Sequence, residues 1–300
     1  MMESRNDDMQ TPTDDRAPDH PADLRDWIGR TERRSDTLAA APLAGLAATL
    51  DREGEREPVP GAPLPPLAHW LYFLPKALRR ETGADGHPLR GGFLPPVPLP
   101  RRMWAGGRLQ FERDLRVGDE AERRSTIARV DAKMGRSGAL VFVTVRHEIG
   151  DARGVALTEE HDIVYRANPD ASAHPSAPTP APVDEAFSRA VVPDPVLLFR
   201  YSALTFNGHR IHYDRPYATG VEGYPGLVVH GPLIATLLVD LVRREMPDAR
   251  LRAFAFKAAR PLFDIHPFAV CGKHEGGGRV ALWARDHEGH LAMQARADLA

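Results

Sequence analysis

The stretch HGPLIATLLVDLVRREMPDA, residues 230–249, decides the fold of this 300-residue chain. Its start is predicted by Pro232, which suits the first helical position, and its end by Met246-Pro247-Asp248. Apolar residues recur between these limits at helical spacing, at Leu233, Leu237, Leu238, Leu241 and Val242. The stretch therefore predicts a long helix that turns one apolar face toward a core.

Four runs of strand length follow this helix, at residues 252–263, 268–275, 279–289 and 290–299. Gly, Pro and His-Glu-Gly turns separate them, and HEGGGR (274–279) is typical of a hairpin turn. One long helix followed by about four antiparallel strands indicates an α+β hotdog, in which a sheet wraps around a central helix.

A segment rich in Ala, Pro and Ser, ANPDASAHPSAPTPAPVDEA at residues 167–186, is expected to be a linker. It separates residues 21–166 from residues 187–300, while residues 1–20 are expected to be a disordered tail. The first part shows the same order of features as the second. SDTLAAAPLAGLAATLD (35–51) predicts a helix with Ser35 as its N-cap, interrupted at Pro42, and GALVFVTVRHEI (138–149) and HDIVYRA (161–167) predict paired strands. Two such halves predict a tandem, or double, hotdog.

Charge and cysteine content exclude several classes of protein. The formal net charge is −2, which argues against a general nucleic-acid binder. The single cysteine, Cys271, rules out an intrachain disulfide and a cysteine zinc site. No apolar run is long enough for a membrane helix, and the N-terminus has no signal-peptide core. We therefore expect a cytoplasmic protein without a nucleic-acid or membrane partner.

The polar stretch LTFNGHRIHYDRPYA, residues 204–218, is the leading candidate for chemistry. Within it, His212 is the first choice as an acid–base group, because imidazole titrates near neutral pH. Gly231 is the first choice as an oxyanion donor, because its N–H lies at the start of the predicted helix, where no helical acceptor is available. The pair predicts a site that polarises a carbonyl and moves a proton beside it.

This stretch resembles the active-site motif of the MaoC-like (R)-specific enoyl-CoA hydratases, in which a His-Gly turn into the central helix follows downstream. In the register of residues 207–212, His212 stands on the family's catalytic histidine. Asn207 stands where the family has an aspartate, and His209 where it has an asparagine. An amide at Asn207 cannot accept a proton, so the chain departs from the family pattern at that position.

A narrower branch shares this Asn/His form. FNGHRIHYD (206–214) is similar to the branch of hydroxyacyl-thioester dehydratase type 2 and of the mesaconyl-C4-CoA and itaconyl-CoA hydratases. The first half resembles the branch's N-terminal hotdog at residues 63–75, 86–107, 115–119 and 135–148. The resemblance implies a degenerate first half that makes room for the substrate and a catalytic second half.

The resemblance also implies a reaction, the reversible addition of water to a 2-enoyl-CoA to give a 3-hydroxyacyl-CoA. In this reaction Gly231 would polarise the thioester carbonyl, His212 would activate water and Asn207 would orient it. Within the branch, we expect a small branched dicarboxylyl-CoA of the mesaconyl-C4-CoA or itaconyl-CoA type, with citramalyl-CoA as product. A basic residue should then pair with the distal carboxylate, and the candidates are Arg101, Arg102 and Arg210.

Further residues are expected to contact the acyl-CoA: Tyr201, His209, Arg210, His230, Arg101 and Trp104. Four of them also have a plainer interpretation, namely core packing for Tyr201, His209 and Trp104 and a surface position for Arg210. Asp214 is better explained as a local cap than as a base. The two histidines three apart have no clear third ligand, so we expect no metal, and no cofactor apart from the CoA of the substrate.

Other functions stay open on the sequence. A 3-hydroxyacyl-thioester dehydratase of fatty acid synthesis would use the same site. A hotdog thioesterase would need a carboxylate near the thioester, which no motif supplies. A non-catalytic acyl-CoA binding protein would account for Asn207. Because two hotdog halves satisfy one pseudo-dimer, we expect either a monomer or a homodimer of such chains.

Overall fold

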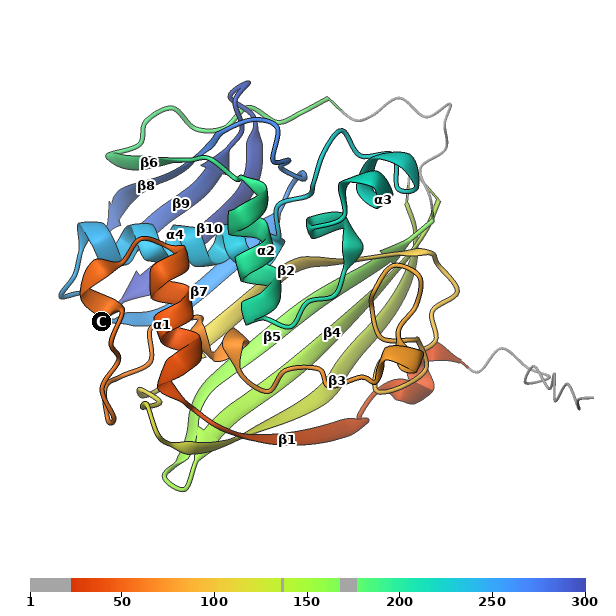
Figure 1. The fold of residues 1–300 in the computed structure, drawn as a ribbon, viewed down its shortest axis with the longest axis horizontal. Coiled ribbons are helices and arrows are strands. Elements are labelled where there is room, and N and C mark those ends of the chain that lie inside the picture. The colour runs from red at the N-terminus through yellow and green to blue at the C-terminus, as the bar shows by residue number, and fades with distance from the viewer. Residues whose placement is uncertain (1–22, 136–137, 168–176) are drawn as a thin grey trace, which may run out of the picture.

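The computed structural model describes residues 23–135, 138–167 and 177–300 (Figure 1). The expected tail at residues 1–20 and residues 168–176 of the expected linker lie outside this range. The described strands form one antiparallel sheet in the order β1-β3-β4-β5-β2-β7-β10-β9-β8-β6. Their bounds are β1 Thr31–Thr37, β2 Arg101–Phe111, β3 Glu120–Gly135, β4 Gly138–Asp151, β5 Gly154–Arg166, β6 Phe187–Val191, β7 Leu251–Ala258, β8 Phe268–Gly276, β9 Arg279–Arg285 and β10 Leu291–Leu299.

The strand order contains the same unit twice. Read from its outer edge to the centre of the sheet, the first unit has the order 1-3-4-5-2. The second unit, read from the opposite edge to the centre, has the order 6-8-9-10-7. The units meet where β2 pairs with β7, at Gly106↔Lys257 and Gly107↔Phe256. A Cβ on Gly106 would lie 2.5 Å from the Phe256 carbonyl oxygen, so glycine allows the two edges to approach this closely.

The helix predicted from residues 230–249 is α4, Gly231–Glu245, with His230 as its N-cap. It begins one residue earlier than predicted, which places Pro232 in its first turn. Its burial goes beyond one face, because every residue from Leu233 to Val242 is buried. The second unit of the sheet covers one side of α4, and Figure 1 shows α1 (Ala40–Thr49) and α2 (Pro195–Leu204) beside it. The four strand runs predicted after this helix correspond to β7 to β10.

The helix predicted over residues 35–51 begins later than expected, so the prediction was wrong at its start. Residues 31–37 form β1, which pairs with β3 and contains Ser35, and the N-cap of α1 is Ala39. The side chains of β1 alternate between half-buried and exposed, which is the strand period and not the helical one. Pro42 falls in the first turn of α1, where a proline removes no helical hydrogen bond, so the helix is not interrupted.

The remaining helices are short. They are α3 Arg215–Gly220 and the 3₁₀ turns η1 Leu24–Trp27, η2 Glu53–Glu55, η3 Ala68–Leu71, η4 Arg79–Glu81 and η5 Arg210–His212. Much of residues 53–100 is irregular chain. Its proline-rich part, residues 93–100, packs on the first unit of the sheet, where Val97 is fully buried with Ile127, Val143 and Tyr165. This proline-rich segment is therefore packed into the first half and not exposed as a free peptide.

Residues 177–186 lie along the second half of the molecule. Thr179 accepts a hydrogen bond from the Leu291 N–H, Ala181 donates to Gly289, and Ala181 is buried. The division of the chain at residues 167–186 stays a prediction. Among the described residues, no helix is both long enough and apolar enough to cross a membrane.

Candidate active site

The motif loop follows α2 and turns sharply. Asp194 caps the start of α2 by accepting the Leu197 N–H, and the helix ends at Leu204. Phe206 then takes a positive φ of 47°, and the side-chain oxygen of Asn207 accepts the His209 N–H at 3.0 Å. This is an Asx turn, in which a short polar side chain satisfies the backbone two residues on. Asn207 therefore shapes the loop that carries His209 and His212.

His212 is held in one tautomer. Its Nδ1 lies 2.7 Å from the carbonyl oxygen of Val228. A carbonyl only accepts hydrogen bonds, so Nδ1 carries the proton and Nε2 keeps a free lone pair. Burial lowers the pKa of His212 to about 4, although the bond to Val228 partly opposes this shift. At neutral pH the ring is thus uncharged and able to accept a proton at Nε2.

His230 and Gly231 place the helix start against His212. The His230 and His212 rings stack with centroids 3.7 Å apart, and His230 Nε2 lies 2.8 Å from the Ser202 hydroxyl. Gly231, the next residue, begins α4, where backbone N–H groups have no helical acceptor. A Cβ on Gly231 would meet nothing closer than the Trp104 carbonyl oxygen at 4.0 Å. The structure thus brings the predicted base and the predicted oxyanion donor to one place.

Both halves line a cavity of about 1170 Å³, which is large enough for an acyl thioester. Its wall includes the predicted site residues Arg101, Trp104, Tyr201, Asn207, His209, His212, His230 and Gly231. Strands β3, β4 and β5 of the first half contribute another part of the wall, including Arg123, His147, Glu159, His161 and Tyr165. The second half supplies the motif loop, and the first half supplies much of the space.

The three candidate arginines differ in their partners. Arg210 binds the Asp214 carboxylate at 2.7 Å, lies over the Tyr217 ring and is outside the cavity wall. Arg101 lines the cavity and forms an ion pair with Glu222 at 3.6 Å. Arg102 lines the cavity beside its strand partner Tyr165, and no carboxylate of the described residues forms an ion pair with it. Of the three candidates, Arg102 is therefore the one best placed to meet an anionic acyl group.

Other predicted residues occupy packed positions around the cavity. The buried Tyr201 hydroxyl lies 3.3 Å from Thr236 Oγ1, and its ring meets His230 edge-on. The Trp104 ring stacks on His161 at 3.7 Å, and its Nε1 donates to the Gly106 carbonyl oxygen. Asp214 accepts the Tyr217 N–H as the N-cap of α3, as predicted. Apart from Arg210, the predicted residues surround one space.

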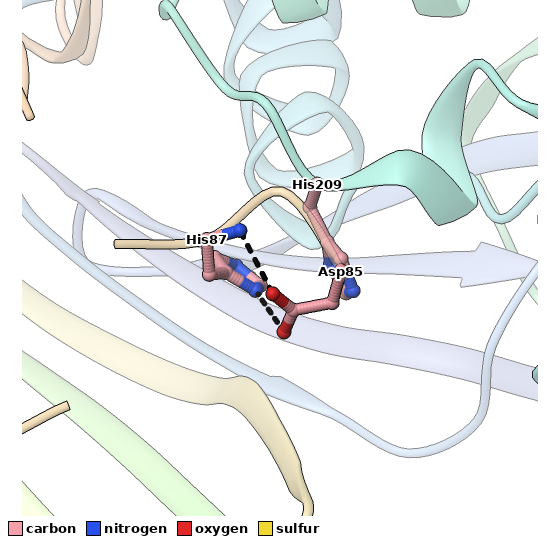
Figure 2. A group of neighbouring side chains, drawn as sticks. All are labelled: Asp85, His87 and His209. Carbon is pink, nitrogen blue, oxygen red and sulfur yellow. Dashed lines mark hydrogen bonds and ion pairs between the residues drawn. The ribbon is translucent and has the colours of Figure 1, made fainter. Parts of the chain in front are cut away.

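Asp85 and His87, which were not among the predicted site residues, reach the motif loop from the first half. Figure 2 shows both side chains next to His209. The two loops meet at Gly86 and Gly208, where a Cβ on Gly86 would lie 1.8 Å from the Gly208 carbonyl oxygen. The Arg210 N–H donates to the Asp85 carbonyl oxygen at 2.9 Å. The Asp-x-His spacing at residues 85–87 was the only local signal of this pair.

The first half also contains a buried acid–base pair that the sequence did not suggest. His69 Nε2 lies 3.0 Å from the Glu159 carboxylate, which also accepts the Trp70 N–H. Burial, the largest single effect, would raise the pKa of Glu159, but the His69 hydrogen bond and the electrostatic effect of His69, His147 and His161 together lower it to about 2. The carboxylate is therefore ionised, and His69 and Trp70 already bind it. We interpret it as a structural part of the cavity wall.

Two groups of described side chains bring ligand-type atoms within 4.8 Å of one another: Asp85, His87 and His209, and Asp286, Glu288 and His290. In the first group, both Asp85 oxygens already accept hydrogen bonds from His87. We therefore treat it as a hydrogen-bonded cluster. The expected absence of a metal and of a cofactor stays a prediction.

Comparison with known proteins adds to this geometry. Residues 67–264 match the profile of the family hydroxyacyl-thioester dehydratase type 2. A mesaconyl-C(4)-CoA hydratase of Chloroflexus aurantiacus is 49% identical over 285 residues, which covers 93% of this chain and 98% of that protein.

Two solved structures share the fold at low sequence identity. A MaoC-like dehydratase from Phytophthora capsici superposes with a TM-score of 0.66 at 15% identity, covering 92% of this chain and 98% of that one. A Mycobacterium tuberculosis protein described as a double hotdog superposes with a TM-score of 0.57 at 14% identity, covering 91% and 96%. The predicted α+β tandem hotdog is confirmed.

Proposed function

The chain belongs to the hydroxyacyl-thioester dehydratase type 2 family, as its motif predicted, and from this premise we propose that it is an acyl-CoA hydro-lyase. It adds water reversibly to a 2-enoyl-CoA and gives a 3-hydroxyacyl-CoA. The observation that carries the proposal is the pairing of His212, neutral and protonated on Nδ1, with the free N–H at the start of α4.

The reaction follows from these two groups. The thioester carbonyl accepts a hydrogen bond from the Gly231 N–H, which makes C3 more electrophilic. His212 Nε2 takes a proton from water as the water oxygen bonds to C3, and the C2=C3 electron pair moves toward the thioester oxygen. Collapse of this enolate returns a proton to C2, so that water has been added and His212 is neutral again. The buried cavity strengthens each polar contact.

The substrate is a small branched dicarboxylyl-CoA of the mesaconyl-C4-CoA type, with citramalyl-CoA as product. Identity of 49% to a mesaconyl-C(4)-CoA hydratase over most of both chains supports this choice. Arg102 supports it independently, because an arginine in the cavity wall without a carboxylate partner among the described residues can pair with the free carboxylate of such an acyl group. A plain 3-hydroxyacyl-thioester of fatty acid synthesis would offer Arg102 no anion.

One assay separates this activity from the alternatives. The protein is mixed with mesaconyl-C4-CoA, itaconyl-CoA and crotonyl-CoA, and enone absorbance and free thiol are followed together. We expect loss of the enone of mesaconyl-C4-CoA without thiol release. Release of thiol would indicate a thioesterase, and retained CoA binding with neither signal would indicate a binding protein.

The variant His212→Gln tests the site in the same assay. We expect the hydration rate to fall by about 10²- to 10⁴-fold, the usual contribution of a positioned acid–base group, with an unchanged melting temperature. A folded His212→Gln protein with wild-type hydration would refute the assignment of the base.

We also propose that the protein works in the cytoplasm as a single pseudo-dimeric chain or as a homodimer. Its partner is the acyl-CoA substrate. It needs no cofactor and binds neither nucleic acid nor membrane. These proposals rest on the composition and on the internal repeat of the hotdog unit.

A further inference from the structure

The motif loop lacks a group that its chemistry needs. Asn207 cannot accept a proton, and its side-chain oxygen is already used by the His209 N–H. No carboxylate of the described residues forms an ion pair with His212, whose near partners are the Val228 carbonyl and the His230 ring. A water molecule beside His212 Nε2 therefore has one strong acceptor in the motif loop and needs another to be held in place.

The first half places a suitable group opposite this loop. Asp85 and His87 both line the cavity that contains His212 and Gly231. The His87 ring lies 4.0 Å from the His209 ring, and the His209 ring lies 5.4 Å from the His212 ring, measured between centroids. The contact between Gly86 and Gly208 brings the turn that carries Asp85 and His87 against the motif loop.

Asp85 determines the tautomer of His87. One carboxylate oxygen lies 3.2 Å from His87 Nδ1, and the other accepts the His87 backbone N–H at 3.0 Å (Figure 2). Burial alone would raise the pKa of Asp85, but these hydrogen bonds hold it well below its usual range. An ionised carboxylate only accepts, so Nδ1 carries the proton of the neutral ring and Nε2 keeps its lone pair. His87 thus has the same tautomer as His212.

Other carboxylates of the cavity wall are less suited to orienting a histidine beside the motif loop. Glu159 is bound by His69 and Trp70, Glu222 is paired with Arg101, and Glu32 is paired with Arg34. In contrast, Asp85 has a carboxylate oxygen within 4.8 Å of a ring nitrogen of His209, inside the motif loop itself.

We propose that His87, held by Asp85, is the second acceptor for the attacking water and replaces the carboxylate that the motif has lost at Asn207. This inference rests on the proposed hydratase function. One hydrogen of the water is bonded to His212 Nε2 and the other to His87 Nε2. The first proton moves to His212 as the oxygen bonds to C3 and the C2=C3 pair moves onto the thioester oxygen, and it then passes to C2. The second hydrogen stays on the oxygen and becomes that of the product hydroxyl.

In this arrangement His87 is a catalytic residue, because it contacts the reacting water, and Asp85 is a positioning residue that acts through His87. The two halves of the chain then share one active site, with His212 and Gly231 from the second half and His87 from the first.

The test uses His87→Gln, Asp85→Asn and the double variant, with mesaconyl-C4-CoA as substrate. For His87→Gln we expect kcat to fall by about 10²-fold or more, with KM changed only a few-fold and the melting temperature unchanged. In Asp85→Asn, the amide N–H can donate to Nδ1 and move the proton of His87 to Nε2, so kcat should fall similarly. The double variant should lose no more than His87→Gln alone, because Asp85 acts through His87.

A matched control is His290→Gln. His290 is also paired with an aspartate, Asp286, at 3.6 Å, but it lies in the turn before β10 and outside the cavity wall. We expect wild-type kinetics for this variant. As a second measurement, added imidazole should partly restore activity to His87→Ala, which a loss due to misfolding would not allow.

Several results would overturn the inference. If His87→Gln and Asp85→Asn keep wild-type kcat while His212→Gln is inactive, the hydratase function stands and the role of His87 is refuted. If the fold-loss of kcat in the double variant equals the product of the fold-losses in the two single variants, Asp85 does not act through His87. A divalent metal bound stoichiometrically in the purified wild type and lost in Asp85→Asn would also refute it. If the wild type hydrates no enoyl-CoA, the proposed function fails first.

Discussion

The contact between Gly86 and Gly208 gives the most direct test of how the two halves build one site. We predict that Gly86→Ala separates the loop carrying Asp85 and His87 from the motif loop. A Cβ at residue 86 would lie 1.8 Å from the Gly208 carbonyl oxygen, whereas real Cβ atoms stay at least 3.0 Å from such atoms. The loops must therefore move apart by about 1.2 Å, the difference between these distances.

Two costs follow from this substitution. Gly86 has a φ of +87°, which costs a residue with a Cβ roughly 1–2 kcal/mol. The displacement affects catalysis separately, since a shift of about 1 Å in a positioned group can reduce the rate by about 10²-fold. We therefore expect a moderate loss of stability together with a loss of kcat of about 10²-fold.

The control is Gly289→Ala, because Gly289 has the same φ of +87° but no atom within 4 Å of its Cβ position. Thermal unfolding and the hydration of mesaconyl-C4-CoA are measured for both variants. Both variants should lose the stability that the positive φ costs, with a larger loss in Gly86→Ala because of its backbone clash, and we expect a loss of kcat in Gly86→Ala alone. Equal and near-wild-type kcat values would refute the view that the register of these two loops matters for catalysis.

Three further predictions concern pH, the core and specificity. The free energy of unfolding should fall as the pH drops from 6.5 toward 4. The reason is that burial holds the pKa of several histidines below the value of 6.5 that an unfolded histidine has. These pKa values are about 3 for His147, about 4 for His161, about 2 for His209 and about 4 for His212. The unfolded chain then binds protons that the folded chain does not, which lowers the free energy of unfolding by about 1 kcal/mol per pH unit for each group. Equal midpoints of urea unfolding at pH 7 and pH 5 would contradict this prediction. Asp240→Ala should lower the free energy of unfolding in urea by about 3 kcal/mol, because this buried carboxylate binds Arg52, Arg189 and Arg244. The control is Asp248→Ala, which should have little effect because Asp248 is exposed. Arg102→Gln should raise KM for mesaconyl-C4-CoA by about 10- to 100-fold and leave crotonyl-CoA kinetics unchanged; an equal effect on both substrates would argue against pairing with the acyl carboxylate.

The sequence by itself determined the second half of the protein well. The periodicity of residues 230–249 predicted α4, and the runs that follow it predicted β7 to β10. The motif of residues 207–212 predicted that His212 and Gly231 would act together, and the structure places them at one cavity. These features are local in the chain, because hydrophobic periodicity and a helix start depend on neighbouring residues.

Only the tertiary structure decided the other features. Ser35 is in a strand because β3 offers a partner for residues 31–37, which the local sequence does not show. The three candidate arginines look alike in the sequence and are distinguished only by their partners, Asp214 for Arg210 and Glu222 for Arg101. Asp85 and His87 reach the site through loop contacts such as that between Ala84 and Arg210, 126 positions apart. Irregular loops have no periodicity, so their meeting depends on how the two sheet units join, and that arrangement places Asp85 and His87 beside Gly208 and His209 of the motif loop.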